Sequence, residues 1–258
     1  MKKRKNNKKK LIIITIIILI LWLIFKSIML VLCSIDINNY TDITKGLKNR
    51  DEITITNKSL ADDEYFIIGN LKMKNIMDGY KIDDINSPQK YIKEINGKKS
   101  IINFISDVEK NTTIVNSFKS KTKNIGIYGE KNKVLDIYYL ADRKGFLLEN
   151  NIENDIDFYK FVGDNYPIKN TLFTSIKKMM QNYAFNYCVN IAVPKIESMT
   201  IIKGDLEGYI FEVGSNNNIK TYQITILDND KQYGFSTNDS RFKDKDFMID
   251  VISTINID

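Results

Sequence analysis

The sequence contains no histidine, only two cysteines and only three prolines in 258 residues. Without histidine, the chain cannot build a Ser-His-Asp or Cys-His nucleophilic site, a histidine-containing zinc site or the commonest general base. Three prolines leave no proline-rich spacer. We therefore expect no catalytic, cofactor-binding or metal-binding residue, and a protein that is not an enzyme.

The two cysteines are too differently placed to suggest a disulfide. Cys33 ends an apolar run near the start of the chain, whereas Cys188 lies alone in the remainder, in "AFNYCVNIAV". Its apolar surroundings predict that Cys188 is a small core residue rather than a nucleophile. Cys33 also suggests an acylated lipoprotein cysteine, although Leu32 stands where a lipoprotein signal has a small residue.

Phosphate binding and serine catalysis find little support in the sequence. No glycine-rich phosphate loop is present. The pattern S-x-x-K, which supports histidine-free serine catalysis, occurs at Ser87–Lys90, Ser120–Lys123 and Ser175–Lys178. Such repeats are expected by chance in a lysine-rich chain, and the K-T-G and S-D-N partners of penicillin-binding enzymes are absent. Only Ser175 falls on a well-defined helical pattern.

Carboxylates cluster in the sequence at three places. Asp62–Glu64 and Asp83–Asp84 are most simply solvated turns, since acidic side chains are usually exposed. Asp228–Asp230 begins like a calcium loop, but Tyr233 and Asp239 stand where such a loop needs glycine and glutamate. We therefore predict a hairpin turn there.

The apolar segment at the start of the chain is the clearest feature. Residues 11–35 are apolar apart from a few positions such as Lys26. At ~1.5 Å per residue this segment is long enough for the ~30 Å hydrocarbon core of a bilayer. We expect a retained transmembrane helix over 11–35, with cleavage or lipidation at Cys33 left open. Lys26 is expected to extend toward the outer interface, and Trp22 is assigned no role.

Charge predicts the orientation of this helix. Residues 1–10 carry seven Lys or Arg and no acid, which predicts a cytoplasmic tail. Residues 36–258 are then extracytoplasmic, outside the cell membrane, and the lipid bilayer is a partner through residues 11–35. Beyond residue 35 there are 30 basic and 32 acidic residues, a net charge of −2. The overall charge of +6 thus belongs to the anchor, and no nucleic-acid partner is expected.

The pattern of residues 36–258 predicts an α+β fold, with antiparallel sheet and packed helices. We predict a linker over 36–52 that can form a short helix, a first α+β region over 53–165 and a second region over 166–258, or one domain over 53–258. In the first region, Ser87 and Gly97 suggest the start and end of a helix. Apolar spacing predicts further helices over 99–110 and 156–162, and strands over 52–56, 64–68, 112–118, 124–129, 133–141 and 145–150.

The second region is more regular. A helix is predicted over 171–188, with an apolar stripe from Leu172 to Tyr183. Four antiparallel strands follow over 198–203, 208–213, 219–227 and 231–237, joined by short Gly, Asn and Asp links. In the third, Tyr222, Ile224 and Ile226 alternate with polar residues and mark its buried face. Phe247–Ile255 then predicts a closing amphipathic helix.

This order of elements resembles the C-terminal part of PsbP-type modules on bacterial surfaces. The resemblance covers about a quarter of the chain and implies no functional residue. We expect a single-pass, membrane-anchored bacterial protein whose outer part is a non-enzymatic binding or interaction module for a protein or an envelope component. Two alternatives stay open: an envelope hydrolase using Ser-Lys or carboxylate chemistry, and a membrane-bound immunity or sensor protein.

Overall fold

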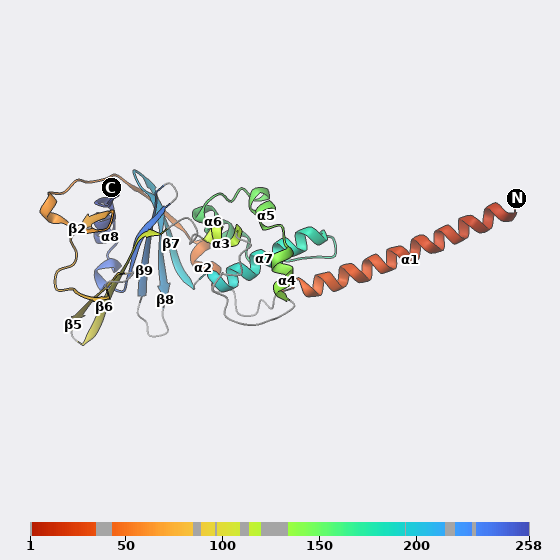
Figure 1. Ribbon diagram of the computed structural model, residues 1–258, viewed down its shortest axis with the longest axis horizontal. Helices are drawn as coiled ribbons and strands as arrows, with labels where there is room; N and C mark the ends of the chain where they lie inside the picture. The colour runs from red at the N-terminus through yellow and green to blue at the C-terminus, as the bar shows by residue number, and fades with distance from the viewer. Residues whose placement is uncertain are drawn as a thin grey trace.

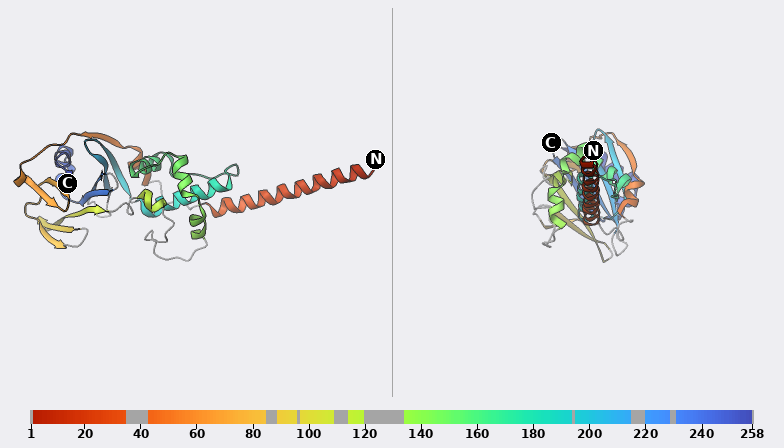
Figure 2. Two further views of the ribbon diagram at one scale, coloured as in Figure 1. Left: turned by 45° about the horizontal axis from the view of Figure 1, so that its top comes forward. Right: turned by 90° about the vertical axis from the view of Figure 1, so that its right-hand side faces the viewer.

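A computed structural model describes residues 2–34, 43–84, 89–95, 97–108, 114–119, 134–193, 195–214, 220–228 and 231–257. Helix α1 (Lys2–Leu32) projects from one end of the molecule (Figure 1). Along the long axis follow a layer of helices, a large sheet, and a small sheet with a closing helix (Figures 1 and 2). The two ends of the chain therefore lie near opposite ends of the molecule.

The large sheet has eight strands in the order β1-β7-β8-β9-β10-β6-β5-β4. Its neighbouring strands pair antiparallel, except that β1 runs parallel to β7. The small sheet has the order β11-β3-β2. The strands are β1 (Asp51–Ile55), β2 (Tyr65–Ile68), β3 (Leu71–Lys74), β4 (Lys81–Asp84), β5 (Gln89–Ile95), β6 (Lys98–Val108), β7 (Ile196–Gly204), β8 (Glu207–Gly214), β9 (Lys220–Asp228), β10 (Lys231–Thr237) and β11 (Asn256–Ile257).

The predicted α+β class and the four-strand meander of the second region are confirmed. Strands β7 to β10 are sequential antiparallel neighbours, as their short links predict. In β9, Tyr222, Ile224 and Ile226 are buried, as their alternation predicts. The eight-stranded sheet takes strands from both predicted regions, because β1, β4, β5 and β6 join the meander.

The helices predicted over Ser87–Gly97 and 99–110 are wrong. Strands β5 and β6 form an antiparallel hairpin there, and Gly97 (φ +73°) lies in its turn rather than ending a helix. Ser87 itself lies outside the described residues. Ile102 and Phe104, two positions apart, face the core, while β6 pairs with β10 on its other edge. Backbone hydrogen bonds to β10, about 130 residues further along the chain, thus outweigh the helix that the spacing of the apolar residues favours.

Three predicted strands of the first region are helices instead. These are α3 (Ile114–Lys119), α4 (Val134–Leu140) and α5 (Arg143–Glu149), where strands were predicted over 112–118, 133–141 and 145–150. The spacing of short apolar runs fits both the helical and the strand period. Here a carboxylate oxygen accepts a backbone amide hydrogen at the start of two of these helices. Asp142 accepts from Gly145 N at 2.9 Å in α5, and Asp155 accepts from Val115 N at 3.1 Å in α3. The strand predicted over 124–129 lies outside the described residues.

The other predicted helices are confirmed, with shifted ends. They are α6 (Asp155–Asn165), α7 (Ile176–Ala192) and α8 (Lys245–Ser253), and the linker contains α2 (Ile43–Lys48). Helix α7 begins five residues after the predicted start, because Ser175 caps it, so Leu172 lies before the helix and is exposed. Two 3₁₀ helices, Asp62–Glu64 and Ser240–Lys243, complete the described elements.

The two faces of the large sheet support two separate cores. In β8, Tyr209 and Phe211 contact the helix layer, whereas Ile210 faces α8 and the small sheet. Helix α2 packs against β7 and α6. Its approach is close enough that a Cβ on Gly46 would lie 2.4 Å from the carbonyl oxygen of Ile196. The helix layer is therefore bound tightly to the sheet.

Among the described residues, helix α1 packs against the folded part only near its C-terminal end, through Met29 and Leu30. From Leu11 to Phe25 its large apolar side chains are each 42–66% exposed. Within the described residues, α1 is the one helix that is long and apolar enough to cross a membrane, over Leu11–Leu32. Lys26 does not extend outward as expected: it is 6% exposed, and its amine lies 4.7 Å from the ring centroid of Trp22. The reason is geometric, since helical side chains tilt toward the N-terminus and therefore over the preceding turn.

Candidate functional site

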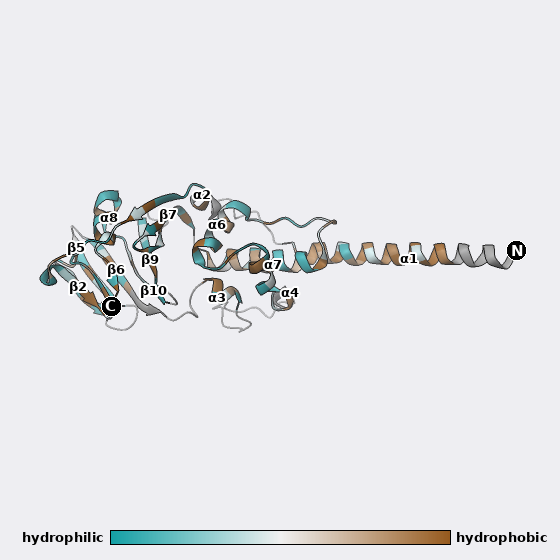
Figure 3. Cartoon of the chain, turned by 90° about the horizontal axis from the view of Figure 1, so that it is seen from above, coloured by the Kyte–Doolittle hydropathy of each residue, from teal (hydrophilic) through white to brown (hydrophobic). Residues whose placement is uncertain are grey.

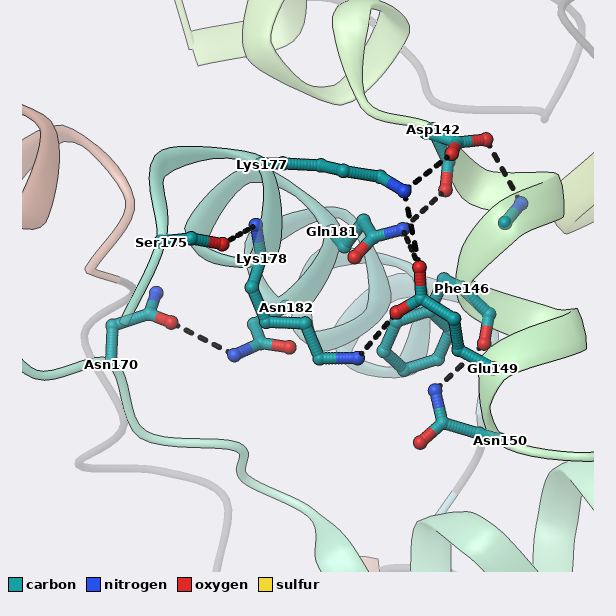
Figure 4. Close-up of polar contacts among 11 residues, drawn as sticks. Asp142, Phe146, Glu149, Asn150, Asn170, Ser175, Lys177, Lys178, Gln181 and Asn182 are labelled. Atoms are coloured by element: carbon teal, nitrogen blue, oxygen red, sulfur yellow. Dashed lines mark hydrogen bonds and ion pairs between the residues drawn. The ribbon is translucent and has the colours of Figure 1, made fainter. Parts of the chain in front are cut away.

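The Ser175–Lys178 pair lies at the start of α7, facing α5 (Figure 4). Ser175 Oγ accepts a hydrogen bond from the backbone N–H of Lys178 at 3.2 Å, which makes it the N-cap of the helix. The amine of Lys178 is 3.0 Å from Glu149 Oε2. Each side chain thus has another partner, and the contact required for Ser-Lys catalysis is not formed between them.

Around this helix start lies a group of exposed ion pairs. Lys177 lies 3.1 Å from Glu149 Oε1 and 3.2 Å from Asp142 Oδ2. Hydrogen bonds from Lys178 and Lys177 lower the pKa of Glu149 to about 2, and the amide of Gly145 followed by Lys177 lowers that of Asp142. The same carboxylates raise the pKa of Lys177. Glu149, Asp142 and Lys177 therefore stay charged near neutral pH, whereas a general base that works near that pH needs a pKa close to it.

Beneath the ion pairs the site becomes buried and polar. Gln181 Nε2 donates to the carbonyl oxygen of Asp142 at 3.0 Å, and Asn182 Nδ2 donates to Asn170 Oδ1 at 2.9 Å. The amide oxygens of Gln181 and Asn182 are buried and have no hydrogen-bond partner among the described residues. These contacts position the loop before α7 and the start of α5 against one helix.

Arg143 is the functional candidate that the sequence did not reveal. It is 3% exposed, and its guanidinium carbon lies 4.5 Å from the ring centroid of Tyr138. Within the described residues, neither its Nη1 nor the hydroxyl of Tyr138 has a hydrogen-bond partner. The ring face compensates for part of the cost of burying the charge. One arginine in "ADRKG" carries no sequence signal of burial.

Cys188 lies in the same layer and is buried, as predicted. Burial raises the pKa of its thiol to about 12, so the reactive thiolate is absent near neutral pH. This supports the interpretation of Cys188 as a core residue.

A second buried charge, Asp155, was also missed. Its carboxylate accepts from the amides of Ile114 and Val115 at 3.3 and 3.1 Å and from Gln232 Nε2 at 2.9 Å. Burial raises the pKa of this carboxyl. Because one carboxylate joins α3, α6 and β10, its evident role is to bind the helix layer to the sheet.

The remaining sequence candidates are separate from this site. Asp62–Glu64 forms an exposed 3₁₀ turn, as predicted. Asp83 and Asp84 end strand β4 rather than forming a turn, and Asp83 forms an ion pair with Lys90 at 2.7 Å. Asp228 pairs with Lys231 across the predicted hairpin. Ser120–Lys123 lies outside the described residues. In the part of the chain that the structure describes, no three Cys, Asp or Glu side chains gather as metal ligands would.

Comparison with known proteins adds no relative. No family model, no curated protein and no solved structure matches the chain. Over its described residues, the structure is that of an α+β protein with one N-terminal helix of membrane-spanning length.

Proposed function

We propose that the chain is a single-pass bacterial membrane protein, in which residues 36–258 form a non-enzymatic, extracytoplasmic module that binds a protein or an envelope component. The observation that carries the proposal is the contrast between α1 and the remainder. Two cores bury large sets of apolar side chains from the sheet and the helix layer, whereas the large apolar side chains of α1 from Leu11 to Phe25 are all exposed. Lipid is the solvent that suits such a helix.

The energetics favour insertion despite Lys26. Each Leu, Ile or Phe in the centre of a span favours insertion by about 0.3–0.6 kcal/mol, so the apolar residues of Leu11–Phe25 together contribute roughly 4–8 kcal/mol. A lysine at the centre opposes insertion by about 2.5–3.5 kcal/mol, and by less near an end. The apolar sum is larger. The basic residues of segment 1–10 then favour a cytoplasmic N-terminus.

External protease on intact protoplasts tests this arrangement. We expect the protease to remove the folded part, and alkaline carbonate to leave the untreated protein in the membrane pellet with its N-terminus uncut. Protection from the protease would contradict the orientation. A chain starting at an acylated Cys33 would favour the lipoprotein alternative, and a chain starting at Ser34 in the medium would favour cleavage.

The non-enzymatic part of the proposal rests on Ser175, Lys178 and Glu149, whose contacts are those of a helix cap and ion pairs. A serine-reactive phosphonate probe tests it. We expect the native protein to stay unlabelled, as the Ser175→Ala variant must. Labelling of the native protein that this variant abolishes would favour the hydrolase alternative.

One contact favours the sensor alternative as a second candidate. Cys33, directly after α1, is part of the helix-layer core, and Asn170 Nδ2 donates to its carbonyl oxygen at 3.3 Å. A displacement of α1 would thus act on the folded part directly. Replacing residues 11–32 with an unrelated apolar span tests this. Loss of the biological response, with the outer part still folded, would support signalling through the helix, whereas an unchanged response would exclude it.

A further inference from the structure

The loop of residues 171–174, which we call the tip loop, carries an exposed apolar pair. Phe173 is 96% exposed, and its neighbour Leu172 is also exposed. The tip loop precedes α7 and projects beside the last turns of α1, in both views that show it from the side (Figures 1 and 2). Hydropathy colouring shows its end as hydrophobic (Figure 3). Covering this apolar pair with an apolar partner is favourable, because it removes apolar surface from water.

Contacts with α1 fix the position of this loop. Asn170, directly before the tip loop, donates from Nδ2 to the carbonyl oxygen of Cys33. Helix α1 contacts α7, and Met29, Leu30 and Cys33 face the helix layer. The tip loop therefore lies at the level of the last turns of α1.

Those turns of α1 are themselves suited to lipid. On the side away from the helix layer, Ile28, Val31 and Leu32 are exposed. If the span ended at Phe25, the uncharged run Leu11–Phe25 would cover only ~22 Å at ~1.5 Å per residue, less than the ~30 Å core. Extension to Leu32 gives ~33 Å, which is sufficient. The last turns of α1 thus belong at the outer boundary of the hydrocarbon, and the tip loop beside them lies at nearly the same depth.

Most backbone amides of the tip loop are hydrogen-bonded within the loop, which suits an environment with little water. Thr171 N donates to Thr174 Oγ1 at 2.9 Å, Phe173 N to Thr171 Oγ1 at 3.2 Å, and Thr174 N to the carbonyl oxygen of Thr171 at 3.0 Å. Three amides are therefore bonded within the loop. This lowers the cost of entering the interface, because an unpaired amide is penalised there.

We propose that Leu172 and Phe173 insert into the outer leaflet of the bilayer that α1 spans, as a second membrane contact of the folded part. This inference rests on the proposed membrane anchoring. With two points of contact, the module cannot rotate freely about α1. The small sheet and α8, at the opposite end of the molecule from α1, are then the parts directed away from the membrane (Figure 1).

The single tryptophan of the chain allows a direct test. The full-length double variant Trp22→Phe, Phe173→Trp is reconstituted in phosphatidylcholine vesicles whose lipids carry bromine either near the headgroup or deep in the acyl chain. We expect blue-shifted emission that is quenched more by shallow than by deep bromine. The matched control is Trp22→Phe, Ile67→Trp, since Ile67 is an exposed apolar residue on β2, far from α1. Its emission should stay unquenched.

The unmodified protein separates the two proposals. Its Trp22 lies within α1 and should be quenched by deep bromine if α1 spans the bilayer. Quenched Trp22 with an unquenched Phe173→Trp variant would overturn the tip-loop inference alone, as expected if the loop bound a protein instead. Unquenched Trp22 would overturn the membrane span as well. Equal quenching of the Phe173→Trp and Ile67→Trp variants would show non-specific adsorption and would also overturn the inference.

Discussion

Phe185 of α7 holds the helix layer together, and its truncation to alanine should destabilise the protein severely. Its side chain is fully buried. Its ring centroid lies 5.0 Å from that of Phe146 in α5, 5.5 and 5.2 Å from those of Phe158 and Phe161 in α6, and 6.4 Å from that of Phe118 in α3. One side chain thus contacts rings from three other helices.

The magnitude follows from the loss of this packing. A buried Phe→Ala substitution lowers the free energy of unfolding by about 3–5 kcal/mol, because it removes apolar contacts and leaves a cavity. We expect the upper part of that range for Phe185→Ala, since aromatic pairs add about 0.5–1.5 kcal/mol beyond burial. At ~2–4 °C per kcal/mol for a chain of this size, a loss of about 4–5 kcal/mol should lower the melting temperature by about 8–20 °C.

Thermal unfolding of the full-length protein in detergent micelles, followed by near-ultraviolet circular dichroism, measures this effect. The matched control is Phe173→Ala, which changes the same residue type at an exposed position. Its free energy of unfolding should change by less than about 0.5 kcal/mol. If Phe185→Ala shifted the melting temperature no more than Phe173→Ala, the packing described for the helix layer would be refuted.

Other substitutions test the polar groups. Ser175→Ala should lower stability by about 0.5–2 kcal/mol through loss of the α7 cap, measured by urea unfolding; no change would contradict the capping role. Burial raises the folded-state pKa of Asp155, so its contribution to stability falls as pH rises above about 3.9 toward that pKa; Asp155→Asn should remove this fall from a plot of the urea midpoint against pH. For Asp239, burial acts upward but hydrogen bonds from Arg241 outweigh it, and the pKa is lowered. Its stabilisation is present above about pH 3.9 and lost as pH falls through the folded pKa, so Asp239→Asn should flatten the acid side of the same plot; an unchanged acid side would contradict the assignment. Cys188 should resist iodoacetamide in the native protein and react on unfolding, as mass spectrometry would show; rapid native labelling would contradict its burial.

Local patterns determined the parts of the fold that need no distant partner. The length and composition of Leu11–Leu32 predicted α1, because an apolar segment long enough to span a bilayer has to satisfy its backbone hydrogen bonds within itself, as a helix does. Alternation in β9 and the short Gly, Asn and Asp links determined the meander, since such links allow only antiparallel neighbours. In the site, the sequence placed Ser175 inside the predicted helix, and only the structure showed that it lies before α7 as its N-cap.

Tertiary contacts decided the remainder. The spacing of a short apolar run fits a helix or a strand equally well. Lys98–Val108 forms a strand because β10 supplies a neighbouring edge, whereas α3 to α5 form helices that pack against α6 and α7. The burial of Arg143 and Asp155 depends on the same long-range packing. Asp155 meets Gln232, a residue 77 positions away. Whether a charged side chain is buried depends on its neighbours in space, and these neighbours are distant from it in the sequence.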